Sequence, residues 1–204
     1  LILWGLWKFA ASPSKVAFLN YRIIETGRIA KANDNSMIKL YELAPEDISK
    51  AGRYDILLIN GMGLRITEEQ RARIQRAAGR GLPVISTMVT NPANDINTAD
   101  SSDIENIKAY LSNGGQANYR NMLLYIRRHI DGKRLAAPEP DPAEEYTVEN
   151  IYHQSPENKD EKGFGSIAAY EDWLKDNGFW KDDAPRIVVT GQMGEPAEPI
   201  ASLE

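Results

Sequence analysis

Four short apolar runs, separated by segments with helix signals, constrain the fold of this chain more than any other feature of its sequence. The runs span residues 15–21, 38–43, 54–60 and 83–89. Runs of four to eight apolar residues predict strands, and the unbroken run at 54–60 is typical of a strand covered on both faces. Strands alternating with helices at this spacing predict an α/β fold, a Rossmann- or flavodoxin-like parallel sheet with flanking helices and right-handed crossovers.

Helix signals lie between and after these runs. Pro45 stands at an early helical position, and Thr67 with Gln70 forms a capping box, in which two side chains satisfy free backbone groups. The helix that Thr67 begins is predicted to end at Arg80 and Gly81. Further helices are predicted over residues 22–33, 101–113 (capped by Ser101 or Ser102), 117–129 and 166–177.

Composition sets limits on function. The 204 residues carry a formal net charge of −5, so the basic surface expected of a nucleic-acid-binding protein is missing. Cysteine is absent, which excludes disulfides, thiolate zinc sites, iron–sulfur clusters and cysteine nucleophiles. His129 and His153 are the only histidines. We therefore predict no nucleic-acid partner and no metal site built from this chain alone.

The chain is predicted to consist of five parts. They are the end of a membrane anchor (1–14), an α/β head domain (15–131), a linker rich in proline and acidic residues (132–150), a loop and helix (151–184), and the start of a second α/β unit (185–204). A helix that crosses a bilayer needs about 20 apolar residues, and the apolar run 1–7 is shorter than that. Its two tryptophans and the following lysine nevertheless suit the interface between membrane and water. We therefore predict the end of a membrane anchor, with a cleaved signal peptide or a short core strand or helix as the alternatives.

Gly61 and Gly63 follow a predicted strand, as in dinucleotide-binding turns. The full fingerprint needs a third glycine, and Ile66 stands at that position. We therefore predict a tight turn at the carboxyl edge of the sheet, the edge where open α/β sheets bind ligands. The layout of residues 54–85 is similar to amidotransferase-like and flavodoxin-like domains, but amidotransferase chemistry needs a cysteine. Ser86 lacks the small-residue elbow that exposes a nucleophilic serine.

Two basic clusters and an acidic stretch are expected to be solvated or paired within the chain. The helix begun at Thr67 presents Arg71, Arg73, Arg76 and Arg80, a face that could meet an anion. A second cluster consists of Arg120, Arg127, Arg128, Lys133 and Arg134. Thirteen acidic residues against four lysines lie between Glu139 and Asp183, so pairing with the second cluster is the default, and anionic lipid is an alternative partner. His129, near a helix end, suits the helix dipole.

Three segments together resemble one family. The run AYLSNGGQANYRNMLLYI at 109–126 is similar to the YxxxGGxxNxxNLLRYL pattern of the large tetrapyrrole chelatase subunits: the CobN family, the magnesium chelatase H subunit and the haem-utilisation protein HmuS. Residues 151–153 resemble the family's YHP run, with Gln154 in place of proline. Residues 185–190 and 200–204 resemble the strand and helix that open its next domain, although 190–193 differ from the usual aromatic-basic sequence.

The resemblance implies one part, at the N-terminus, of a large protein that holds a tetrapyrrole and inserts or removes its central metal. Haem or another metallotetrapyrrole would then be the substrate, and any ATP would be hydrolysed by separate AAA+ partner subunits. The apparent anchor favours the haem-utilisation branch, with removal of iron from haem by a protein anchored in the bacterial inner membrane, its soluble part in the periplasm, beside haem-uptake proteins.

Within that resemblance, His153 and then Tyr152 are the candidate contacts to tetrapyrrole or metal, since imidazole is a common axial ligand of haem iron. Arg120, Arg127 and Arg128 are candidate contacts to propionates. Most catalytic groups would lie outside this fragment.

Two alternatives stay open. A cobaltochelatase large subunit that inserts cobalt in corrin synthesis would be cytoplasmic and would need AAA+ partners. A non-catalytic, membrane-anchored α/β interaction module would recruit a partner through its acidic segment.

Overall fold

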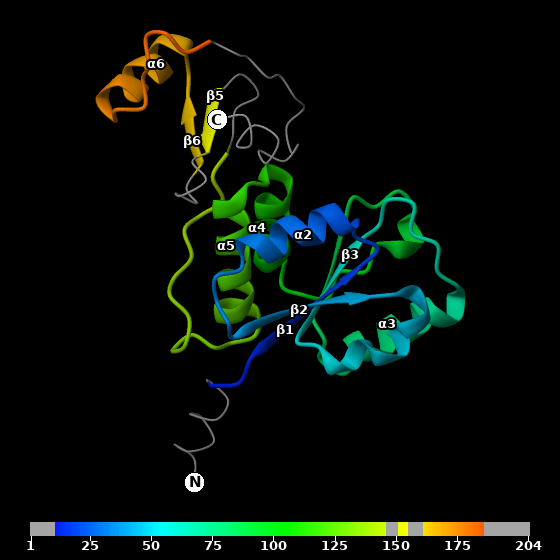
Figure 1. The fold of residues 1–204 in the computed structure, drawn as a ribbon. Coiled ribbons are helices and arrows are strands. Elements are labelled where there is room, and N and C mark those ends of the chain that lie inside the picture. Colours follow the sequence, from blue (N-terminus) through cyan, green and yellow to red (C-terminus); the bar gives the residue numbers. More distant parts are fainter. Residues whose placement is uncertain (1–10, 146–150, 155–160, 186–204) are drawn as a thin grey trace.

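The computed structural model describes residues 11–145, 151–154 and 161–185, and in these residues the main sheet is parallel (Figure 1). Its strands lie in the order β2-β1-β3-β4, and all the pairings are parallel. The strands are β1 (Ser14–Leu19), β2 (Ile38–Leu43), β3 (Ile56–Asn60) and β4 (Val84–Thr87). The predicted α/β fold is therefore confirmed, and the order matches the first four strands of a flavodoxin-like sheet.

Helices cover both faces of this sheet. One face packs against α2 (Ile23–Ala32), α4 (Ser101–Asn113) and α5 (Gln116–Tyr125), and the other against the 3-10 helix η1 (Pro45–Arg53) and α3 (Glu68–Ala78). The 3-10 turn η2 (Pro92–Asn94) follows β4. Parallel strands are joined by crossover connections that run over one face of the sheet. This layering therefore follows directly from the alternation of apolar runs and helices.

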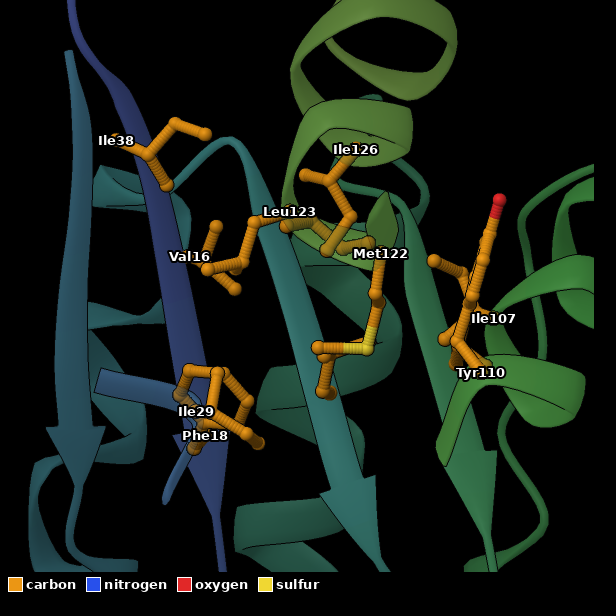
Figure 2. Packing of buried hydrophobic residues seen from close by; sticks show 12 residues of the cluster. Val16, Phe18, Ile29, Ile38, Ile107, Tyr110, Met122, Leu123 and Ile126 are labelled. Atoms are coloured by element: carbon orange, nitrogen blue, oxygen red, sulfur yellow. The ribbon is translucent and has the colours of Figure 1, made fainter. Parts of the chain in front are cut away.

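The two faces of the central strand β1 belong to two separate hydrophobic clusters. Val16 lies beside Leu123 of α5 and Phe18 beside Ile29 of α2, in a cluster that also includes Met122 (Figure 2). Ala17 and Leu19, two residues apart on the same strand, belong to the cluster on the opposite face, with Ile48 of η1 and Ile74 of α3. A fully buried aliphatic side chain contributes about 1.5–3 kcal/mol, so the sheet is stable only when both layers are in place.

Helix ends agree with the sequence in part. The capping box at Thr67 is confirmed: its hydroxyl accepts from the Gln70 amide at 3.2 Å, and the Gln70 side chain accepts from the Thr67 amide at 2.8 Å. The predicted serine cap of α4 is wrong, because both serines are already helical and Asp100 has the extended backbone of the cap. The predicted helix 117–129 is divided into α5 and a π-helical turn, η3 (Ile126–Ile130), in which the Asp131 amide donates to the Ile126 carbonyl at 2.8 Å.

The segment 151–154 is a strand rather than the predicted loop. β5 (Ile151–Gln154) pairs antiparallel with β6 (Glu161–Phe164). The helix predicted over residues 166–177 is present as α6 (Ile167–Asp176), and the Ser166 side chain caps it. A four-residue strand whose partner follows a polar stretch has too little periodicity to be recognised in advance. Three parts of the predictions lie outside the described residues: 1–10 of the anchor, 146–150 of the linker and 186–204 of the second α/β unit. No helix among the described residues is long and apolar enough to cross a membrane.

A buried arginine joins the amino ends of β1 and β2 to the end of α5. Arg127 is 1% exposed, and its Nη1 donates to the Ser12 carbonyl at 3.0 Å, the Ser14 hydroxyl at 3.0 Å and the Met37 carbonyl at 3.3 Å. Burial lowers the pKa of Arg127, and the charge of Asp131 opposes this effect. Because the arginine bonds two strands at once, it holds the helical layer in register with the sheet.

The Asp131 carboxylate completes this cluster. It accepts from the Ser14 hydroxyl at 2.5 Å and from Lys133 Nζ at 2.5 Å, and Lys133 also donates to the Pro13 carbonyl at 3.1 Å. Lys133 is 3% exposed, so the cluster places two cations and one anion in the interior with their hydrogen bonds provided.

We expect replacement of Arg127 by methionine to lower the free energy of unfolding by about 3–5 kcal/mol, as loss of one partner from a buried charged network does. The substitution keeps much of the length of the side chain but leaves three acceptors, one of them fully buried, without their donor. Urea unfolding followed by circular dichroism measures the change. Arg134→Met, at the exposed position directly after Lys133, is the control and should change the value by less than about 0.5 kcal/mol. Equal midpoints for the two variants would contradict the assignment.

Candidate functional site

The carboxyl edge of the sheet contains the point where the chain changes direction. From β1 the chain crosses to β2 on one side, and from β3 it crosses to β4 on the other. In open α/β sheets this arrangement separates the loops after the two central strands and leaves a crevice between them, which is where ligands bind. Here the loops follow Leu19 and Asn60, and they form the first candidate site.

Two asparagine side chains join these loops. Asn20 has a φ of 63°, and its Nδ2 donates to the Asn60 carbonyl at 2.8 Å and the Met62 carbonyl at 3.0 Å. The Asn60 side chain in turn accepts from the Met62 amide at 2.9 Å. Asparagine tolerates a left-handed backbone because its amide can bond locally. The amides therefore fix the two loops against each other rather than pointing freely toward solvent.

Gly61 has a packing role. A Cβ at this position would lie 2.9 Å from Val89 Cα, so only glycine allows the loop after β3 to approach the segment after β4. Gly63 has a φ of 64°, a left-handed conformation. The Thr90 hydroxyl accepts from the Gly63 amide at 3.3 Å and donates to the Gly61 carbonyl at 3.2 Å. The predicted tight turn is thus confirmed, and its glycines serve the turn.

Tyr21 places a phenol at the same edge. Its hydroxyl lies 3.3 Å from the Thr87 hydroxyl, which also donates to the Ile59 carbonyl at 3.3 Å. The Tyr21 ring meets Phe18 edge to face, with ring centroids 5.2 Å apart. Burial raises the pKa of Tyr21 to about 12, although the bond to Thr87 opposes this effect. The phenol is therefore a neutral hydrogen-bonding group at physiological pH.

Exposed apolar side chains surround these polar groups. Ile23 is 80% exposed and Ile24 49%, both at the start of α2, while Met62 is 53% exposed and Met88 58%. They come from the loops after three neighbouring strands, and we call them the apolar rim. Met88 also has a φ of 50°, a strained conformation for a residue other than glycine. Exposed apolar groups gathered at a ligand-binding edge, with flexible methionines among them, indicate contact with an apolar ligand or partner.

The arginines predicted to contact propionates bind groups of this chain. Arg127 is buried at the opposite edge of the sheet, as described above. Arg120 Nε lies 3.3 Å from the Asp34 carboxylate. Arg128 forms an ion pair with Glu139, and its Nη1 donates to the Arg134 carbonyl at 2.6 Å and the Ala137 carbonyl at 2.8 Å. The three side chains do not converge on one ligand-sized space, so the default of intramolecular pairing describes them best.

His129 shares the Glu139 carboxylate with Arg128. Its Nε2 lies 3.0 Å from Glu139 Oε1, and its ring stacks on Tyr125 with centroids 4.6 Å apart. Desolvation would raise the pKa of Glu139, but the hydrogen bonds and charges of Arg128 and His129 hold it below its usual range. The imidazole therefore serves to dock the segment after η3 more than to complement a helix dipole.

The asparagines of the GGxxNxxN run hold the acidic segment in place. The Asn118 side chain is 0% exposed, and it both donates to the Glu144 carbonyl and accepts from the Glu144 amide, each at 2.8 Å. Asn121 accepts from the Asp141 amide at 3.2 Å, and the Tyr110 hydroxyl donates to the Asp141 carbonyl at 2.5 Å. Residues 141 and 144 of the acidic segment are thus bonded to side chains of α4 and α5.

His153 lies in a small aromatic cluster formed by β5, β6 and α6. It is 7% exposed, its Nδ1 lies 2.9 Å from the Tyr170 hydroxyl, and its ring centroid is 4.8 Å from that of Trp173. Phe164 contacts both Tyr170 and Trp173. The side chain of Tyr152, the second predicted contact, lies outside the described part of the chain. The surroundings of His153 are those of a packed, hydrogen-bonded histidine.

The described residues supply binding groups and no metal centre. Among them, no three histidine, aspartate or glutamate side chains gather so that they could hold a metal ion. The amides and hydroxyls of the carboxyl edge are bonded within the chain, so the apolar rim is the binding surface that this edge offers. Sequence reasoning located this edge but missed Asn20, Tyr21 and Met88. It placed them inside the predicted strands 15–21 and 83–89, whereas β1 ends at Leu19 and β4 at Thr87.

The raised pKa of Tyr21 predicts a loss of stability in alkali. The folded chain keeps the phenolic proton up to a pKa of about 12, whereas the unfolded chain releases it near the ordinary value of 10.0. Below pH 10 the contribution is fully present, and as pH rises from 10 toward 12 the free energy of unfolding should fall. Unfolding at several alkaline pH values measures this, and Tyr21→Phe should show a smaller decline. An identical decline in both proteins would contradict the prediction.

Replacement of Asn118 by alanine should release the acidic segment. Loss of its two hydrogen bonds is expected to cost about 1–3 kcal/mol locally, so a glutamate-specific protease should cut after Glu144 roughly 5- to 150-fold faster. Asn121→Ala, which removes one longer bond, should have a smaller effect. Equal cleavage rates in the wild-type chain and the Asn118 variant would show that the two hydrogen bonds of Asn118, here called the Asn118 clamp, do not hold the segment.

Comparison with known proteins supports the resemblance seen in the sequence. Residues 108–199 match the model of the family described as CobN/Magnesium Chelatase. No curated protein matches the chain. Among solved structures, the catalytic subunit of cobaltochelatase from Mycobacterium tuberculosis is similar, with a TM-score of 0.50 and 14% sequence identity, over 70% of this chain and 12% of that one.

These findings differ in what they establish. At 14% identity the structural similarity speaks for the fold alone, and the chain spans only 12% of the similar subunit. The family match is carried by sequence, and it includes the GGxxNxxN run with the Asn118 clamp. The resemblance to the large tetrapyrrole chelatase subunits is therefore confirmed for residues 108–199, which match the model of the CobN/Magnesium Chelatase family.

Proposed function

We propose that this chain is part of a large chelatase-like protein that handles a tetrapyrrole. The observation that carries the proposal is the family match over residues 108–199. The similarity in fold to part of a cobaltochelatase catalytic subunit is consistent with it. Because the described residues hold no metal-binding cluster, the reaction itself would require groups from elsewhere in the full-length protein.

The apolar rim is the part of this chain that we assign to ligand contact. A tetrapyrrole is a broad, flat and largely apolar ring, and Ile23, Met62 and Met88 offer exposed apolar surface from three adjacent loops. Methionine adapts its shape to such a surface. His153 and Tyr152 remain candidate contacts of the family's YHP-like run, although the His153 ring is already packed against Trp173.

Within the chelatase class we propose haem utilisation, in which iron is removed from haem. Release of Fe²⁺ requires two protons to take its place on the pyrrole nitrogens, so the reaction consumes protons and needs no ATP in its balance. The apolar run at 1–7, which lies outside the described residues, supports an anchor in the bacterial inner membrane with a periplasmic soluble part. Haem-uptake proteins would be the natural partners.

Insertion of cobalt in corrin synthesis is the second candidate. The solved structure with a similar fold is titled as the catalytic subunit of a cobaltochelatase, which favours this candidate over other insertions. It would place the protein in the cytoplasm with AAA+ partner subunits that hydrolyse ATP. A non-catalytic interaction module is the outcome if no tetrapyrrole binds.

A haem titration of the full-length protein under anaerobic, reducing conditions tests the proposal. A shifted Soret band that converts to a free-base porphyrin spectrum would support iron removal. Haem binding without conversion, combined with cobalt incorporation into a metal-free corrin precursor when AAA+ subunits and ATP are added, would support the second candidate. The absence of binding by both haem and porphyrin would overturn the tetrapyrrole proposal.

The role of the apolar rim has its own prediction. Met62→Lys combined with Met88→Lys should weaken haem binding at least about tenfold, because two charges would replace apolar contacts at the ligand surface. Leu135→Lys, which changes a side chain that is 99% exposed in the segment after η3, is the matched control and should bind haem as the wild-type protein does. Equal affinities in all three proteins would show that the ligand binds elsewhere.

A further inference from the structure

A second hollow lies at the amino edge of the sheet, away from the apolar rim. It has a volume of about 600 Å³ and is formed between η1 and α3. Its lining includes Ile48, Ser49 and Gly52 from η1, and Arg73, Arg76 and Arg80 from α3 and the turn after it. The volume lies within the range of small-molecule sites, about 300–1,000 Å³.

Three guanidinium groups line this hollow from one side. Arg73 and Arg76 are three residues apart on one face of α3, and Arg80 follows in the turn after the helix. Arg73 is paired with Glu69, with an N–O distance of 2.7 Å. Neither Arg76 nor Arg80 makes a side-chain hydrogen bond or ion pair with another residue in the described part of the chain.

In the described part of the chain, the two carboxylates of the lining form no ion pair with Arg76 or Arg80. Asp55 accepts from the Lys15 backbone amide at 2.8 Å, and Asp131 accepts from Ser14 and Lys133 as part of the buried cluster. Both carboxylates therefore serve to fix the amino end of β1. The last turn of a helix favours cations, but like charges one turn apart repel each other. An anion between Arg76 and Arg80 would relieve that repulsion.

We propose that this hollow binds a small polyanion that carries at least two carboxylate or phosphate groups. Guanidinium groups bind both kinds of oxyanion through paired N–H donors, and two arginines one turn apart suit two such groups on one molecule. Ser49 adds a hydroxyl, while Ile48 and Leu82 provide apolar contact for the body of the ligand. The site is separate from the proposed tetrapyrrole contact and does not depend on it.

Isothermal titration calorimetry of the 204-residue chain with citrate and with pyrophosphate tests the proposal. The two probes distinguish a preference for carboxylate from a preference for phosphate. One or both should bind with a 1:1 stoichiometry, and acetate should bind far more weakly because it has one carboxylate. Arg76→Ala combined with Arg80→Ala should weaken binding at least about tenfold, since both charged hydrogen-bond donors are lost. Amide chemical shifts of Gly52 and Gly81, which line the hollow, should move on titration of the wild-type chain.

The matched control is Arg65→Ala combined with Arg134→Ala, which removes the same charge from exposed positions outside the lining. It should leave affinity within about twofold at physiological salt, where distant surface charges are screened. The Arg76 and Arg80 variant should also be at least as stable as the wild-type chain, because repulsion is removed. The proposed site is wrong if neither citrate nor pyrophosphate binds at millimolar concentration. It is also wrong if both double variants lose the same amount of affinity.

Discussion

The burial of both faces of two adjacent strands is the constraint on which the rest of this structure depends. Residues 16–19 of β1 and 56–59 of β3 are almost fully enclosed, so the chain must supply helices to each side of the sheet. Parallel pairing then collects all the carboxyl ends at one edge and all the amino ends at the other. Each of the two candidate sites lies at one of these edges, and their positions follow from the layering.

The parts of the fold that depend on local sequence could be predicted, and those that depend on distant contacts could not. Apolar runs identified the four strands, and the Thr67 capping box fixed the start of α3. The burial of Arg127 was not foreseeable, because its partner Ser14 is 113 residues away. At the candidate site, the tight turn around Gly61 was predicted, whereas the bond between Tyr21 and Thr87 spans 66 residues.

The two edges differ in the chemistry that they offer. The carboxyl edge combines neutral amides with exposed apolar side chains, and the amino edge combines the buried Arg127 cluster with the open guanidinium groups of α3. Arg127 and the arginines of α3 illustrate how one residue type serves two purposes. When enclosed by backbone carbonyls it joins elements of the fold, and when left at the rim of a hollow it is available to a ligand.

The position of the family match has a consequence for dissection of this protein. The match begins at residue 108, inside α4 (Ser101–Asn113), and all four strands of the main sheet precede it. The matched segment therefore supplies one wall of the hydrophobic core, through Met122 and Leu123, to a sheet that the match does not include. A hybrid that exchanged this segment between relatives would exchange that wall together with the GGxxNxxN run, and would fold only on strands shaped to receive it.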